Sequence, residues 1–382
     1  MVKNKYKMQI GKLTCILRFK EGMSIRSISH IIKQIYGFNY STGYISQFCQ
    51  QVGKKAKAKM ETINDVYQSN VKMIIADETF PITQESGTTN LGVIVDEYGV
   101  IRNLKAIIQR KIDLKILFSS TISGYCNPKY FMSDYDKTYP GVIKDVKEKI
   151  IIMKDFVHTL RKLYRNAATA INQVKVKGIE ELTQKKQKQI TQLKKKLLRK
   201  RLYQVLYKIK KGFDSRYASV GTFYIEGGLE ELKELSETFP SLANYYSQVE
   251  KFITKYIDVW AMQMEKGAKV GIPTTSNLIE SKNSILKRFS KRLKYFKTNE
   301  NMEYFFLAVA LMENFDIKTR GANKGTSAFM RAKLNFEELG ATNFFDAIDL
   351  ESIVLGESQS QFKAKSKAKE NKEKNEDQKM AA

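Results

Sequence analysis

The sequence predicts a mixed α/β protein whose sheet is preceded by one helical segment and interrupted by a second, longer one. Helical periodicity dominates residues 158–267, and shorter helical periods end at Gly22 and Gly37 near the N-terminus. Between these regions, apolar runs of strand length alternate with helical segments, which is typical of an α/β sheet. The predicted strands are Met73–Ala76, Leu91–Asp96, Val100–Gln109, Tyr130–Ser133 and Ile150–Met153, and the helices between them are 113–122 and 140–149.

The N-terminal residues have the pattern of a helix-turn-helix. Ser24 and Ser41 are suitable N-caps for two short amphipathic helices, and Gly37 ends the first of them. In a helix-turn-helix, the second helix presents hydrogen-bonding side chains to base edges. The outward side chains expected to do so include Thr42, Tyr44 and Gln47. A plain three-helix bundle without a DNA role is the alternative. Lys54, Lys55, Lys57 and Lys59 follow, and suit phosphate contacts or a flexible linker.

The composition favours a polyanionic partner. Among 382 residues, Lys and Arg number 66 and Asp and Glu number 40, which gives a formal net charge of +26. An excess of this size points first to nucleic acid, with a basic protein that has no such partner as the alternative. The sequence has no apolar run of about 18 residues and no secretory signal pattern. Three widely spaced cysteines without a C-x-x-C pair are typical of reduced thiols, so a cytoplasmic location is expected, nucleoid-associated in a prokaryote.

Two later segments present basic faces. Residues 185–211 contain twelve Lys or Arg and no acid, together with an apolar stripe. Because like charges repel one another, phosphate contact explains this segment better than a solvated face, and a basic coiled hairpin is the alternative. Candidate DNA contacts there are Lys195, Arg199 and Arg201. The stripe is Ile190, Leu193, Leu197, Leu202, Val205 and Ile209. A late helix starting near Ser276 buries Ile285, Phe289, Leu293 and Phe296, and its other face carries Asn277, Glu280, Ser284, Arg288 and Lys291.

Three carboxylates are candidates for one metal site. Asp77 and Asp134 each directly follow a predicted strand, and Glu280 lies on the late helix. Carboxylates supply only oxygen ligands, which suits Mg²⁺ or Mn²⁺. A pair of such ions about 4 Å apart stabilises the attacking and leaving oxygens in phosphodiester displacement. Neighbouring Glu78 and Asp136 are possible substitutes.

The order of these motifs resembles that of DDE transposases with an RNase H-like core, and it is most similar to the Mutator-like group and related insertion-sequence transposases. The residues that carry the resemblance are Asp77, Asp134-Tyr-Asp-Lys-Thr-Tyr-Pro140, Asp155-Phe-Val-His158 and Thr274-Thr-Ser-Asn277-Leu-Ile-Glu280-Ser-Lys-Asn283. The resemblance implies that Asp77, Asp134 and Glu280 bind the metal. It further implies supporting roles for Asp155, His158 and Asn277, and a phosphate contact for Arg161. The group more often has Cys where Asp155 stands.

The resulting expectation is a protein that binds double-stranded DNA at the ends of its own mobile element, as a dimer or higher oligomer. It would hydrolyse phosphodiesters and transfer strands with two Mg²⁺ or Mn²⁺ ions. No membrane partner is expected. The alternatives are a non-catalytic DNA-binding regulator or architectural protein, and a nuclease that only hydrolyses. The expected domains are a helix-turn-helix domain at 1–60, the first part of an RNase H-like core at 70–160, a basic helical insertion at 161–267, the final catalytic and packing helices at 268–320, a C-terminal segment at 321–355 and a disordered charged tail at 356–382.

Overall fold

The computed structural model describes residues 2–66, 71–122, 128–133, 138–174, 178, 180–215, 217–270 and 277–355. Asp134, Asp136, Cys126 and the tail at 356–382 lie outside the described residues. The chain divides into two compact units. The first comprises Met1–Pro128, Gly141–Glu148 and Leu278–Ala382, and the second comprises Lys129–Pro140 and Lys149–Asn277. The domain boundaries expected from the sequence stay predictions.

The predicted α/β class is confirmed by a mixed five-stranded sheet with the order β5-β4-β1-β6-β7. Strand β1 (Met73–Thr79) pairs antiparallel with β4 (Asn90–Asp96), and β4 pairs antiparallel with β5 (Ile101–Ile107). Strand β6 (Tyr130–Ser133) pairs in parallel with β7 (Ile151–Lys154). Each of the five strands overlaps a run predicted from apolar patterning.

The β4–β5 hairpin turns at Asp96–Gly99, where an Asp and a Gly between two strand-length runs favour a turn. Gly99 has φ +80° and donates its backbone N–H to the Asp96 carbonyl at 3.0 Å. A positive φ of this size is accessible to glycine at little cost, which explains why glycine occupies the turn. The polar loop before β4 contains a second, short hairpin of β2 (Ile82–Thr83) and β3 (Gly87–Thr88), which polarity alone did not indicate.

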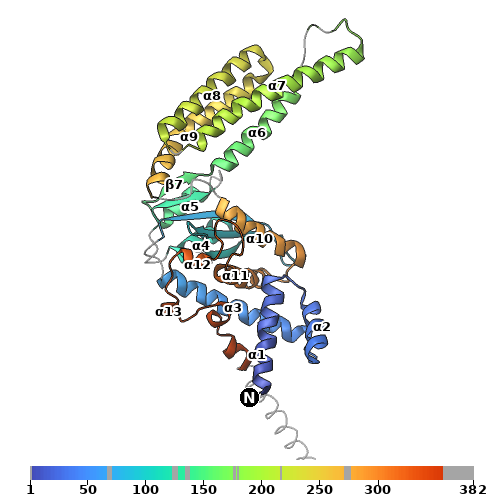
Figure 1. Cartoon of the computed structure of the whole chain (residues 1–382), viewed down its shortest axis with the longest axis vertical. Coiled ribbons are helices and arrows are strands. Elements are labelled where there is room, and N and C mark those ends of the chain that lie inside the picture. The colour runs from blue at the N-terminus through green and yellow to red at the C-terminus, as the bar shows by residue number, and fades with distance from the viewer. Residues whose placement is uncertain are drawn as a thin grey trace, which may run out of the picture. The chain divides into compact units, whose positions relative to one another are not determined.

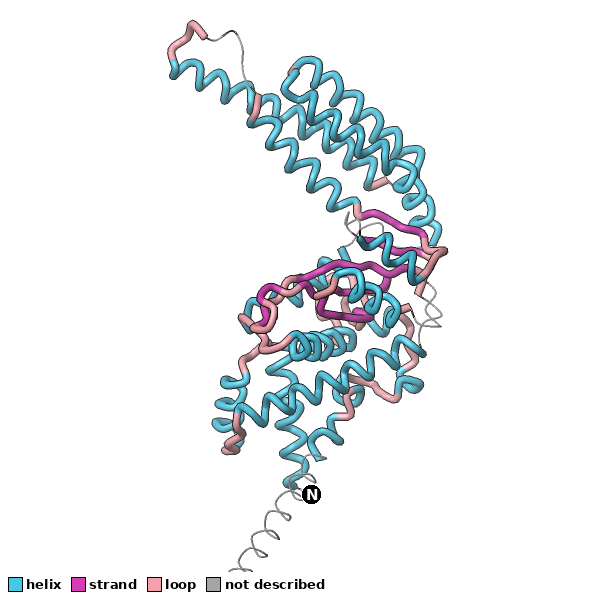
Figure 2. Tube along the Cα trace, turned by 180° about the vertical axis from the view of Figure 1, so that it is seen from behind, coloured by secondary structure: helices cyan, strands magenta, loops and turns pink. Residues whose placement is uncertain are grey.

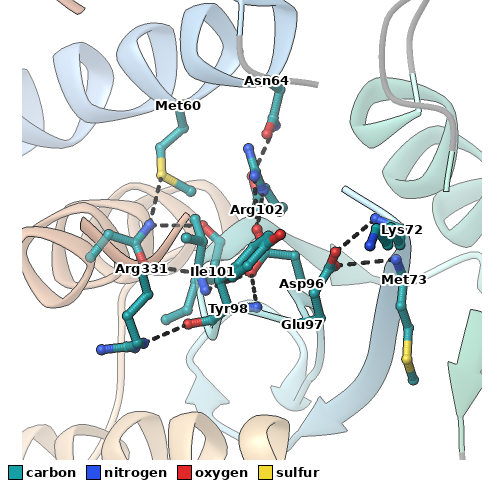
Figure 3. Close-up of polar contacts among 12 residues, drawn as sticks. Met60, Asn64, Lys72, Met73, Asp96, Glu97, Tyr98, Ile101, Arg102 and Arg331 are labelled. Carbon is teal, nitrogen blue, oxygen red and sulfur yellow. Dashed lines mark hydrogen bonds and ion pairs between the residues drawn. The ribbon is translucent and has the colours of Figure 1, made fainter. Parts of the chain in front are cut away.

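A buried ion pair fixes the β4–β5 turn (Figure 3). Asp96 is 0% and Arg102 is 3% exposed, and the guanidinium Nη2 lies 2.7 Å from the carboxylate. The second carboxylate oxygen accepts the backbone N–H groups of Tyr98 and Val100, each at 2.9 Å. Asn64 donates to the carbonyl of Arg102 at 2.9 Å. Because each carboxylate oxygen is hydrogen-bonded, the burial cost of the charge is offset.

The N-terminal helices follow the predicted caps. A π-helical turn, η1 (Ile16–Lys20), continues α1 (Val2–Cys15). Ser24 accepts the Ser27 N–H at the start of α2 (Ile25–Tyr36), and Gly37 ends that helix with φ +71°. The possible linker role of Lys54–Lys59 is wrong, because α3 runs from Thr42 to Val66 and contains these lysines.

Helix α11 (Asn299–Phe315) organises the rest of the first unit. It packs against α3 and β5, and Asn314 bonds the backbone N–H and carbonyl of Ile101, each at 2.9 Å. A Cβ added to Gly53 on α3 would lie 2.5 Å from Tyr304, so the two helices approach closely. The remaining helices that begin or lie in this unit are α4 (Arg110–Thr121), α5 (Thr138–Val146), α10 (Asn277–Leu293), α12 (Ala328–Arg331), α13 (Phe336–Leu339) and α14 (Phe344–Ala347).

The second unit is largely a bundle of long helices that run side by side (Figures 1 and 2). They are α6 (Phe156–Asn172), α7 (Gln184–Phe213), α8 (Ala218–Thr238) and α9 (Ala243–Val270), with the 3-10 turn η2 (Pro240–Leu242). Trp260 is fully buried among them, 4.4 Å from Phe213 between ring centroids. Within the described parts of the chain, no helix combines the length and apolar content needed to span a membrane.

The three glycines at 221, 227 and 228 predict a looser connection over residues 213–229. That prediction is wrong, because most of this segment is helical. Its glycines permit close packing of α8 instead of breaking the chain. A Cβ added to Gly221 would lie 2.5 Å from the sulfur of Met264, and one added to Gly228 would lie 2.5 Å from Ile209. On α7, a Cβ at Gly212 would lie 2.6 Å from the carbonyl of Gly221. Glycine preference for turns was therefore outweighed by packing that involves another helix.

The predicted apolar stripe on α7 is correct only in its C-terminal half. Leu202, Val205 and Ile209 are buried against the neighbouring helices, whereas Leu193 and Leu197 are 59% and 58% exposed. Helical periodicity identifies an apolar face, but the position of the neighbouring helices decides how much of it is covered.

Gly228→Ala is expected to lower the free energy of unfolding of the helical bundle by about 1–3 kcal/mol, because the new methyl group overlaps Ile209. Gly227→Ala is the matched control, since its Cβ would meet only the mobile end of Lys208 and alanine favours a helix by about 1 kcal/mol. Urea unfolding followed by fluorescence of Trp260, the single tryptophan, reports on this unit. Equal midpoints for Gly228→Ala and the parent would contradict the close approach.

Candidate functional site

Asp77 lies inside β1, so the prediction that it follows the strand end is wrong. The strand continues through Glu78 and Thr79, which are opposite Gly92 and Leu91 on β4. Antiparallel pairing is made by backbone groups and therefore extends past the last apolar side chain. Asp77 nevertheless remains near the C-terminal end of a central strand, and it is half-buried.

The carboxylate of Asp77 is held by hydrogen bonds from a helix and from its own strand. Asn283 of α10 donates its Nδ2 to Oδ2 at 2.6 Å, and the backbone N–H of Glu78 donates to Oδ1 at 2.8 Å. Asn283 is 2% exposed, and its Oδ1 has no hydrogen-bond partner among the described residues. A carboxylate oxygen accepts more than one contact, so these bonds orient Asp77 without excluding a cation.

Glu280 belongs to the same face of α10 as Asn283. The two residues are three positions apart, a spacing that places side chains one turn apart on a common face. Glu280 is half-buried. The structure thus brings the α10 face bearing Glu280 to the strand of Asp77 within the first unit. The third predicted carboxylate, Asp134, lies outside the described residues.

Asn283 is the residue at this site to which sequence reasoning gave no role. The available signal was its position one turn after Glu280. The sequence placed Ile285 and Phe289 on the buried face of this helix, and Phe289 is buried while Ile285 is half-buried. The direction in which Asn283 points depends on β1, more than 200 positions earlier, so the late helix alone could not reveal it.

Glu78 has a structural role, which weighs against it as a substitute for Asp77. Its carboxylate accepts from Arg110 at 2.9 and 3.1 Å and from Asn90 at 2.9 Å. The side chain is 9% exposed. Alternation along the strand also directs it to the sheet face opposite Asp77.

Asp155 and His158, predicted to support the site, are hydrogen-bonded partners in the second unit. Asp155 is fully buried just before α6, and its Oδ2 contacts Nδ1 of His158, whose side chain is 36% exposed. The i,i+3 spacing at a helix start makes this contact possible. A carboxylate on Nδ1 fixes the orientation and tautomer of an imidazole and directs Nε2 outward from the pair.

Buried Lys282 stabilises α10 beside the candidate acids. Its Nζ lies 2.9 Å from the carboxylate of Glu313, which also contacts Lys318. Burial lowers the pKa of Lys282, and the carboxylate of Glu313 opposes that shift. In contrast, the predicted DNA contacts Arg288 and Lys291 are exposed on α10. One helix therefore combines a buried anchoring lysine with an exposed basic face.

The side chains predicted to contact DNA in the second unit differ in solvent exposure. Arg161, Arg199 and Arg201 are exposed. Lys195 is half-buried, and its Nζ donates to the carbonyl of Asn172 at 2.7 Å, so it ties α7 to the end of α6.

The predicted recognition surface of α3 is partly occupied by an aromatic contact. Thr42 and Gln47 are exposed, as the helical period predicts. Tyr44 is half-buried and stacks on Tyr40 with ring centroids 4.9 Å apart. Asn277, at the first position of α10, is exposed.

Asn283→Asp is expected to create a pH-dependent loss of stability. In the folded variant two carboxylates would adjoin, so the pKa of one rises above the unfolded value of about 3.9. The penalty is absent below this value and grows as the pH rises, to about 1–3 kcal/mol near neutrality. Asn277→Asp, an equivalent change at an exposed helix start, should cost nothing. Urea unfolding of both variants by circular dichroism at acidic and neutral pH checks this, and a pH-independent loss would contradict it.

Comparison with known proteins assigns this chain to no family. Neither family models nor curated proteins include a match to its sequence. The functional conclusion therefore depends on the residues and their geometry.

Proposed function

We propose that the chain is a DDE-type transposase that binds the ends of its own mobile element and catalyses metal-dependent phosphodiester hydrolysis and strand transfer. The observation that carries this proposal is the 2.6 Å hydrogen bond from Asn283 to Asp77, which joins the helix of Glu280 to the strand of Asp77. These are two of the three acids that the resemblance assigns to the metal. A sheet in which an antiparallel meander precedes a parallel pair also supports an RNase H-like core.

The residues fit a hard divalent cation. Asp77, Asp134 and Glu280 are oxygen donors, and Asp77 is oriented by a buried amide in the manner of a metal ligand supported by an outer hydrogen bond. These three residues would hold Mg²⁺ or Mn²⁺, two ions in the proposed mechanism. The ions would supply charge stabilisation at the reacting phosphate.

The protein groups then act mainly by orientation. Asn283 fixes the direction of Asp77, and the Asp155–His158 pair presents an oriented imidazole for support of the site or contact with the DNA end. The nucleophile is water in hydrolysis and a DNA 3′-hydroxyl in strand transfer, so no side chain forms a covalent intermediate. This division of roles agrees with a sequence that has only two histidines.

DNA recognition is assigned to two basic regions and one helix. Helix α3, after the α2–α3 turn, would read the element's ends as the second helix of a helix-turn-helix, with Thr42 and Gln47 exposed for that purpose. The exposed arginines of α7 and the exposed Arg288 and Lys291 of α10 would contact phosphates. Joining two ends requires at least a dimer on DNA.

Asp77→Asn, Asp134→Asn and Glu280→Gln should each reduce cleavage and strand transfer at least about 100-fold, while leaving duplex binding intact, because each removes a charged ligand without changing shape. The assay uses the DNA that flanks the gene, with Mg²⁺ or Mn²⁺, and binding is measured with chelator present. Glu338→Gln is the control, since Glu338 is exposed on α13. Processing by the three variants at the parent's rate would refute the assignment.

The same assay separates the alternatives. Correctly placed nicks without joined products would favour a nuclease that only hydrolyses. Duplex binding by the parent protein without any processing, at millimolar Mn²⁺, would favour a non-catalytic regulator or architectural protein.

Arg199→Gln combined with Arg201→Gln should weaken duplex binding and reduce the slope of log affinity against log salt by about 1–2, because each lost phosphate contact releases one counterion fewer. Lys233→Gln combined with Lys251→Gln is the matched control. It removes the same charge from exposed positions of the same helical unit, outside residues 185–211, the segment that contains basic but no acidic residues. Equal slopes for the two double variants would contradict a phosphate-binding role for α7.

A further inference from the structure

A cavity of about 190 Å³ lies within the first unit, between η1, α3, α11 and the residues after α10. Its lining includes two cations, Arg18 and Lys297. Several neutral hydrogen-bonding side chains complete it, among them Ser46, Gln50 and Asn301. None of the described residues that line it is acidic, so the cavity carries an excess of positive charge.

Arg18 is the unusual member of this lining. Its guanidinium lies over the ring of Phe305, 4.9 Å from the centroid, and Nη1 donates to the carbonyl of Met23 at 2.8 Å. Its Nε is buried and has no hydrogen-bond partner among the described residues. No carboxylate in the described part of the chain forms an ion pair with Arg18. A half-buried guanidinium without a counter-charge carries a desolvation cost that no ion pair offsets.

The titratable neighbour of Arg18 does not supply the missing charge. Burial raises the pKa of the Cys49 thiol to about 12, although Arg18 opposes the shift, so Cys49 is neutral at physiological pH. Burial also lowers the pKa of Arg18, which nevertheless remains protonated. Glu300 accepts the hydroxyl of the lining residue Tyr304 at 2.8 Å, and it is exposed.

A second cavity in the same unit is lined by both cations and acids. That cavity, of about 250 Å³, is lined by the cations Lys20, Arg288 and Lys318 and also by Glu313 and Asp316. Asp316 pairs with Lys20 at 2.9 Å and with Lys318 at 3.4 Å. The contrast indicates that the Arg18 cavity has room for an anion that none of the described residues supplies.

We propose that the Arg18 cavity binds a phosphate group. Its volume accommodates a phosphate with attached atoms. Arg18 and Lys297 supply charge, and Ser46, Gln50 and Asn301 supply neutral hydrogen bonds. Arginine matches phosphate geometry with a planar fork of donors. This site does not depend on the transposase proposal.

Two sources could provide the phosphate. Ser46 and Gln50 lie on α3, whose exposed face is the proposed DNA-reading surface, so a phosphodiester of bound DNA could enter the cavity. A free phosphate or a small phosphate-bearing molecule has the same chemistry.

The first experiment measures thermal unfolding of the full chain in inorganic phosphate and in chloride at equal ionic strength. Phosphate is expected to raise the unfolding temperature of the parent by about 2–6 °C more than chloride does. Arg18→Met, which keeps the packing on Phe305, should abolish this difference. Lys297→Gln, at an exposed position of the rim, should reduce it and tests the site even if Arg18→Met does not fold. Lys324→Gln, which removes the same charge from an exposed loop, should behave as the parent.

The second experiment identifies the source by titrating a duplex oligonucleotide at several salt concentrations. A salt-dependence slope reduced by about 1 in Arg18→Met or Lys297→Gln, but not in Lys324→Gln, assigns the cavity to a DNA phosphodiester. An unchanged slope together with a lost response to inorganic phosphate assigns it to a free or small-molecule phosphate. The proposal is overturned if the parent responds equally to phosphate and chloride and the variants bind duplex like the parent. It is also overturned if Lys324→Gln loses both responses to the same extent.

Discussion

The hydrogen bond between Asn283 and Asp77 is the contact on which the candidate chemistry depends. A carboxylate in a central strand must find compensation, and this protein solves the problem differently for each acid. Asp96 pairs with buried Arg102, and Glu78 accepts two hydrogen bonds from Arg110. Asp77 accepts from the uncharged amide of Asn283. An amide donor orients a carboxylate without neutralising it, which is the condition that cation binding requires.

The first unit is assembled from segments that are far apart in sequence. Helix α11 packs against α3 and β5, although it begins 233 positions after α3 ends and 192 positions after β5 ends. In contrast, α6 to α9 contact helices that follow one another closely. Contacts between distant segments cost more chain entropy than local ones. Formation of the helical bundle therefore costs less chain entropy than formation of the first unit. The core of the first unit is complete only after α11 has been made.

Much of this architecture is predictable from local patterns, and the exceptions have one cause. Strand β6 and the Asp96–Gly99 turn follow directly from apolar runs and turn residues, and the caps at Ser24 and Gly37 follow from helix chemistry. Asn283, the helical glycines of α8 and the uncovered half of α7 were not predictable. Their roles are decided by a partner elsewhere in the chain, and no local period encodes the identity of that partner. The prediction that β1 ends before Asp77 was wrong for a related reason, because pairing with β4 determines where β1 ends.

The one-signed charge of α7 has a thermodynamic consequence for the helix itself. Within its exposed N-terminal half, lysines lie one turn apart without acids to separate them, so helix formation brings like charges together. The ions that surround this segment are thus part of what keeps it helical. Any polyanion that condenses on α7 replaces those ions, and by linkage it gains affinity from whatever order it restores. Helix formation in α7 and the binding of a polyanion to it are therefore thermodynamically linked.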